Sequence, residues 1–88
     1  MGTYRDFTVQ QAVTPGASVV NITNNNTTND ECRAVYVGAS GDYDLYVNGA
    51  WVAFAGLNAG SIIPVRATGA RHTSGSSAPD AADINFLY

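Results

Sequence analysis

The sequence predicts a small all-β domain, a β-sandwich or barrel of six or seven short, mainly antiparallel strands. Short runs with alternating apolar side chains follow one another, separated by turns rich in Gly, Pro, Asn and Ser. No run keeps an apolar 3.6-residue period for two turns, so no helix longer than one turn is expected. A type I′ hairpin at Asn48-Gly49 is predicted to lie at the centre of the fold.

The hairpin in Asp42–Ala55 is the clearest element of the sequence. Asn-Gly between two alternating runs favours a type I′ turn, which needs positive φ at both central residues. A two-residue loop fixes the register, and directly opposed residues share a face. The face expected to be core carries Tyr43, Leu45, Val47, Ala50, Val52 and Phe54. The other face carries Asp42, Asp44, Tyr46, Trp51, Ala53 and Ala55.

The N-terminal third has less regular patterning. Phe7–Val13 alternates and is predicted to be a strand or an extended arm, followed by a turn at Pro15-Gly16. Ser18–Thr23 is rich in β-branched residues and predicts a strand. Asn24–Asp30 is wholly polar and predicts a loop that buries nothing.

The remaining elements flank the hairpin. Cys32–Ala39 has no strongly polar face, which is typical of a central strand covered on both sides. Ser61–Thr68 is predicted to be a strand, with Pro64 at an edge or a bulge because proline lacks an N–H. Gly69–Pro79 is predicted to be a flexible Ser/Gly loop, and Ala82–Tyr88 closes the chain as a strand.

The length of 88 residues predicts one domain, 1–88. Residues 1–30 would form an N-terminal arm and the first strands, and residues 31–88 the β core. So small a domain usually needs disulfides, metals or neighbouring chains for stability. The single cysteine excludes an intrachain disulfide, and one cysteine with one histidine cannot build a thiolate or imidazole zinc cage. Neighbouring chains are therefore expected.

The charge pattern limits the classes of partner. The net charge is −3, with four arginines and no lysine, and no basic patch favours nucleic acid or an anionic membrane. Only 12% of residues are charged while 45% are hydrophobic, which is typical of a surface that contacts other proteins. No signal peptide or long apolar run is recognisable, so Met1 is expected to begin the mature chain.

No arrangement of residues indicates catalysis. His72, Ser74, Ser76, Ser77 and Asp80 are the residue types of a hydrolytic triad, but they share one Gly/Ser-rich loop that lacks rigid support. Asp42-x-Asp44 lacks the full spacing of a calcium loop, and Cys32 fits a small buried hydrophobe better than a nucleophile. We expect no enzyme activity, no cofactor and no metal site.

Tyr46 and Trp51 form an aromatic pair on the second face of the hairpin. They could be an anchor for another protein, since Trp and Tyr dominate binding hot spots. They could also be a platform for a sugar, or be covered by a second sheet. The alanines beside them favour close protein packing, and Asp42 and Asp44 could pair with an arginine of a neighbour.

From Arg33 onward the chain resembles the small spike base and capsid decoration proteins at the heads of gene transfer agents and tailed phages. The resemblance spans Arg33–Tyr88. It rests on RAVYVGASGD, a hairpin, a Gly-bounded turn, GSIIPVR, a Gly/Ser/Thr loop and the ending INFLY. The most specific parts are Ala34–Asp42 and Gly60–Arg66.

The resemblance implies a non-enzymatic virion structural protein. It would act as a homo-oligomer that decorates the capsid as a cement protein or forms the base of a spike or fibre. The expected contacts are with further copies and with capsid or other virion proteins, through Tyr46, Trp51, Asp42 and Asp44 and, in the N-terminal arm, Phe7 and Val9. The alternative is a carbohydrate-binding module of a phage spike or tail.

Overall fold

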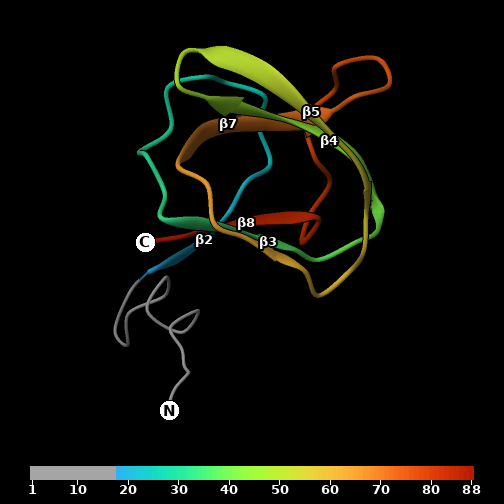
Figure 1. Ribbon diagram of the computed structural model, residues 1–88, viewed down its shortest axis with the longest axis horizontal. Coiled ribbons are helices and arrows are strands. Elements are labelled where there is room, and N and C mark those ends of the chain that lie inside the picture. The colour runs from blue at the N-terminus through green and yellow to red at the C-terminus, as the bar shows by residue number, and fades with distance from the viewer. Residues whose placement is uncertain (1–17) are drawn as a thin grey trace.

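The computed structural model describes residues 18–88. They form a four-stranded sheet of order β2-β8-β3-β6 and a three-stranded sheet of order β5-β4-β7. All strand pairs are antiparallel, and the two sheets pack face to face as a small β-sandwich (Figure 1). The described residues contain no helix. The predicted all-β fold is confirmed.

The strands of the first sheet are short. They are β2 (Val19–Asn21), β3 (Ala34–Val37), β6 (Ile62–Ile63) and β8 (Ile84–Leu87). The second sheet has the longer strands β4 (Gly41–Val47), β5 (Ala50–Leu57) and β7 (Ala67–His72). β3 lies between β8 and β6, so its predicted central position is confirmed, but the predicted cover on both faces is incomplete because Tyr36 is 37% exposed.

The β4–β5 hairpin has the predicted register. Tyr46 lies opposite Trp51 and Leu45 opposite Val52, and Asn48 and Gly49 have φ angles of 53° and 81°. These are the positive φ values that a type I′ turn requires at both central positions. The register shifts once, between Gly41 and Tyr43.

Strand β7 corrects the prediction for the C-terminal half. Gly69–Pro79 was expected to be a loop, but the first part of this segment, up to His72, belongs to β7 and pairs with β4. Gly69 and Ala70 carry little intrinsic β-propensity, so pairing with β4 decides their conformation. Pro64 falls between β6 and β7, where the chain passes from the first sheet to the second.

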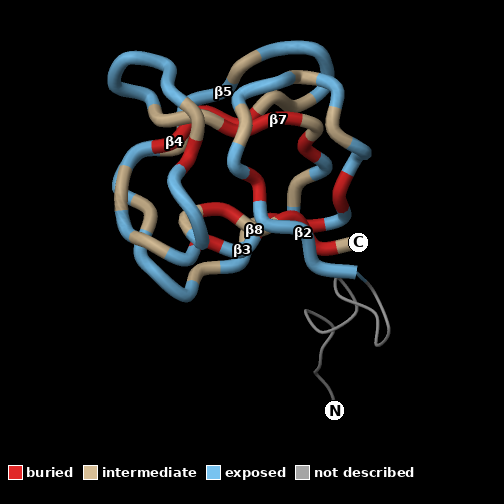
Figure 2. Tube along the Cα trace, turned by 180° about the vertical axis from the view of Figure 1, so that it is seen from behind, coloured by how far each residue is buried: buried red, intermediate tan, exposed pale blue. Residues whose placement is uncertain are grey.

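The core lies between the sheets, as the buried segments of Figure 2 show. Its buried members are Ile22, Cys32, Val35, Val37, Tyr43, Leu45, Ala67, Ala70, Ile84 and Phe86. The prediction that the whole inner face of the hairpin is buried is wrong for β5 and for Val47 at the end of β4, which is only partly buried. Val52 is 42% exposed, Ala50 is exposed and Phe54 is only partly buried. β5 is an edge strand, so its inward side chains lie at the rim of the sandwich.

Candidate protein-binding surface

The aromatic pair lies on the outer face of the second sheet. Tyr46 in β4 and Trp51 in β5 are directly opposed, with ring centroids 5.1 Å apart and an interplanar angle of 68°. Edge-to-face packing of this kind orients both rings. Both side chains are partly exposed, so the described residues do not cover them with another sheet.

Arg71 completes this cluster. β7 places Arg71 opposite Asp44, and the guanidinium carbon lies 4.1 Å from the centroid of the Trp51 ring. The contact is a cation–π interaction across the width of the sheet. This contact does not follow from the sequence pattern, because the Gly/Ser-rich composition of Gly69–Pro79 predicts a loop at Arg71.

Asp44 holds the arginine in this position. Arg71 Nε donates a hydrogen bond to Asp44 Oδ2 at 2.9 Å, and Thr73 Oγ1 donates one to Oδ1 at 2.8 Å. Asp44 is only 7% exposed. Burial alone would raise the pKa of Asp44, but the two hydrogen bonds and the charge of Arg71 outweigh it and hold that pKa below its ordinary value.

Asp42 and Asp44 therefore have different roles, although both were expected at an interface. Asp44 pairs with Arg71 of its own chain, so its carboxylate is not presented to an arginine of a neighbour. Asp42 is exposed, and its Oδ1 accepts a hydrogen bond from the backbone N–H of Gly56 at 2.7 Å. Of the two carboxylates, Asp42 is the one open to solvent.

The polar loop Asn24–Asp30 borders the surface on the β7 side. Asn29 donates to the carbonyl of Thr68 through both its backbone and its side chain, and its side-chain amide bonds that of Asn24. A Cβ at Gly69 would clash with the backbone carbonyl of Asn26, so glycine lets the loop lie close to the sheet. On the opposite side, along β5, no described strand borders the surface.

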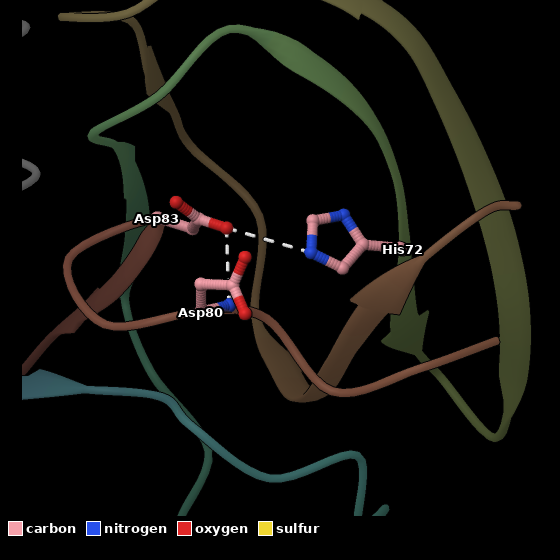
Figure 3. Close-up of side chains that lie close together, drawn as sticks. All are labelled: His72, Asp80 and Asp83. Atoms are coloured by element: carbon pink, nitrogen blue, oxygen red, sulfur yellow. Dashed lines mark hydrogen bonds and ion pairs between the residues drawn. The ribbon is translucent and has the colours of Figure 1, made fainter.

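A second cluster lies at one end of the sandwich. His72, Asp80 and Asp83 point toward one another, and their potential ligand atoms all lie within 4.8 Å (Figure 3). His72 Nε2 is 3.4 Å from Asp83 Oδ2, which also accepts the backbone N–H of Asp80 at 3.0 Å. The His72 ring stacks on Tyr43 with centroids 5.2 Å apart. These contacts fasten the loop between β7 and β8 to the core.

This cluster differs from the triad considered from the sequence. It includes Asp83, which that triad did not contain, and its potential ligand atoms come from one imidazole and two carboxylates. Three ligands are fewer than the four of a structural zinc site or the six or more oxygens of calcium. We assign the cluster to holding the loop.

The other expected residues are placed as follows. Cys32 is buried, as predicted, and burial raises the pKa of its thiol. Phe7 and Val9 lie outside the described residues. Within residues 18–88, no helix is long and apolar enough to cross a membrane.

No protein-family model, curated protein or solved structure matches the chain.

Proposed function

We propose that this protein is a non-enzymatic structural component of a tailed phage or phage-like particle. It acts as a homo-oligomer on the virion, either decorating and cementing the capsid or forming the base of a spike or fibre. The resemblance of Arg33–Tyr88 to spike base and decoration proteins supports the virion part of the proposal. The scarcity of charged residues in so small a domain supports the oligomeric part.

The observation that carries the proposal is the position of Trp51. It is a partly exposed ring held from two sides, by Tyr46 and by the Arg71 guanidinium, on an otherwise open sheet face. A ring held in this way loses little conformational entropy when a partner covers it. Neighbouring Ala53 and Ala55 are small and exposed, so a partner backbone can approach closely.

Alanine substitution tests the binding role of Trp51. Losing a Trp anchor at an interface costs about 2 kcal/mol or more, which is roughly a thirtyfold loss of affinity. Trp51→Ala should therefore dissociate the oligomer in light scattering toward the 9.2 kDa protomer, with an unchanged circular dichroism spectrum. Tyr36→Ala is the matched control, because Tyr36 is an exposed aromatic residue on the other sheet. Equal effects of the two substitutions, or a stable wild-type monomer at micromolar concentration, would contradict the proposal.

The virion assignment has its own test. The gene should lie beside capsid or spike genes. Antibodies should detect the protein in purified particles encoded by the same genome. Purified protein should also rebind particles that lack it. If the Trp51 face contacts the shell, Trp51→Ala should weaken this rebinding by the same factor as it weakens oligomerisation. If another face contacts the shell, rebinding should be unchanged. If particles produced from a genome with the intact gene did not contain the protein, the assignment would be refuted.

A carbohydrate-binding module is the second candidate. Asp44, Arg71 and Thr73 place polar groups close to Trp51, which a sugar site also needs. However, Arg71 lies over the Trp51 ring, where a sugar would stack. If Trp51→Ala left assembly intact and abolished binding on a glycan array, the carbohydrate module would replace the first proposal.

A further inference from the structure

β5 has the longest open edge among the described strands. It spans eight residues and pairs with β4 alone. The other edge strands are short or covered: β2 has three residues and β6 has two, and the outer side of β7 receives hydrogen bonds from the backbone N–H groups of Asn29 and Cys32. None of the eight residues of β5 is buried, as its tube in Figure 2 indicates.

This edge lacks the features that usually prevent strand pairing. Natural edges carry lysine, proline or inward-pointing charges, whereas β5 has the sequence AWVAFAGL. In a two-residue hairpin the pair next to the turn is hydrogen-bonded, and bonded pairs alternate from there. Val52 and Phe54 therefore direct their N–H and C=O groups to β4, while Trp51, Ala53 and Ala55 direct theirs outward. Three consecutive donor and acceptor positions are presented to a partner strand.

We propose that the Phe7–Val13 segment of a second copy adds to this edge as an antiparallel strand. The inference rests on the oligomeric part of the proposed function and is independent of the virion location. Phe7–Val13 has seven residues without charge or proline and alternates in polarity, so its first five residues, Phe7–Gln11, can pair with Ala50–Phe54 of β5. Strand addition would extend the second sheet to four strands.

One register satisfies both the apolar contacts and the charges. With Val9 opposite Val52, Phe7 lies opposite Phe54, so the arm covers the two apolar side chains that the edge position leaves uncovered. The same register places Arg5 opposite Gly56, whose N–H is bonded to the exposed Asp42 carboxylate. Arg5 can then pair with Asp42, and this ion pair favours antiparallel addition of the arm.

The second copy is favoured by where the chain enters the fold. The described chain begins at Ser18, beside β2 in the first sheet, while β5 is in the second sheet. Figures 1 and 2 place β2 and β5 on opposite sides of the sandwich. Because the arm and the β5 edge are different surfaces, their contact is head-to-tail and generates a ring when it closes.

Disulfide trapping between two variants, each with one added cysteine besides the buried Cys32, tests the inference. Opposed residues in a non-hydrogen-bonded antiparallel pair have Cα atoms about 4.5 Å apart, within the range for a disulfide. Val9 and Val52 form such a pair in the proposed register. Mixing Val9→Cys with Val52→Cys under mild oxidation should give a disulfide-linked heterodimer in high yield. Mixing Val9→Cys with Val19→Cys should not, although Val19 is 62% exposed.

Other occupants of the edge give different products. The Val9→Cys/Val52→Cys double variant could instead form an intrachain disulfide, while the mixture of the two separate variants gives no linked dimers. This result would mean that the arm covers the β5 edge of its own chain. Rapid linking of Val52→Cys alone would mean that β5 pairs with β5 of a second copy. Either result, or no linkage at all, overturns the inference.

Ala53→Pro gives a second and independent measurement. It removes an N–H that points away from β4, so the backbone hydrogen bonds between β4 and β5 are kept. The outer edge of β5 loses a hydrogen-bond donor at its centre. We expect the dissociation constant of the oligomer to rise at least tenfold, with Ala53→Ser as the matched control that keeps the N–H. An oligomer unaffected by Ala53→Pro would overturn strand addition but leave the proposed function standing, whereas a monomeric wild-type protein would remove both.

Discussion

Arg71 Nε lies 2.9 Å from Asp44 Oδ2, joining strands β7 and β4 on the outer face of the second sheet. The pair is largely withdrawn from solvent, with side-chain exposures of 25% and 10%. The same guanidinium lies over the ring of Trp51, so the ion pair also positions that ring. Stability and the proposed binding surface therefore depend on the same two side chains.

Removing the guanidinium should destabilise the fold. Arg71→Ala leaves the Asp44 carboxylate nearly buried with only Thr73 as a hydrogen-bond donor. We expect a loss of about 2 kcal/mol in the free energy of urea unfolding, less than the ~3–5 kcal/mol of fully buried pairs because Arg71 is partly exposed. The matched control is Arg66→Ala. It breaks the solvent-exposed Arg66–Glu31 pair, with N and O 3.5 Å apart, and should cost no more than about 0.5 kcal/mol. Equal losses for both variants would contradict the role of Asp44 burial.

The ion pair should also make stability depend on pH. The folded-state pKa of Asp44 is below its ordinary value, so the folded protein favours the charged carboxylate. This contribution is complete above the unfolded pKa of about 3.9 and is lost as pH falls through the lower folded value. Asp44→Asn should be less stable than wild type at pH 7, and the gap should narrow below about pH 4 as the wild-type carboxylate protonates. Urea midpoints between pH 7 and pH 2.5 measure this gap. Asp30→Asn, at an exposed position, is the control, and a gap that stays constant would show that Asp44 does not carry the effect.

The inner face of the hairpin should be energetically asymmetric. Leu45 and Val52 are directly opposed on one face, yet Leu45 is fully buried and Val52 is 42% exposed. Leu45→Ala should cost about 2–5 kcal/mol because it leaves a cavity in the core. Val52→Ala should cost less than about 1 kcal/mol in the dissociated protomer, since little buried surface is lost. Chemical denaturation, at protein concentrations below the dissociation constant of the oligomer, measures both losses of unfolding free energy. Similar losses would mean that the rim at β5 is covered in the protomer itself.

The cysteine should be unreactive in the folded protein. Cys32 is completely buried, its Sγ accepts the backbone N–H of Ala67 at 3.3 Å, and burial raises the pKa of its thiol. Both the lack of access and the low thiolate fraction slow attack on a disulfide reagent. A chromogenic thiol reagent should therefore react only through transient opening of the fold in native buffer, and at once in denaturant. The Val19→Cys variant should react immediately with one equivalent of the reagent. An equally fast reaction of the wild type would contradict the burial of Cys32.

The local geometry of the hairpin could be predicted from its residues. Asn48-Gly49 specified the turn, and the period-two pattern of the flanking runs specified the register that pairs Tyr46 with Trp51. These predictions succeeded because turn dihedrals and side-chain alternation depend on residues close together in the chain.

The exposure of each strand and the contacts between distant residues could not be predicted in this way, because they depend on how the sheets assemble. β7 continues through Gly69–His72 because β4 pairs with it, and the exposure of Val52 follows from the edge position of β5. The Asp44–Arg71–Trp51 cluster joins three strands, and no local pattern marks which arginine reaches the carboxylate. Strand order is a non-local property set by how two sheets can bury their apolar faces together, so burial and the candidate surface emerge only when the sheets assemble.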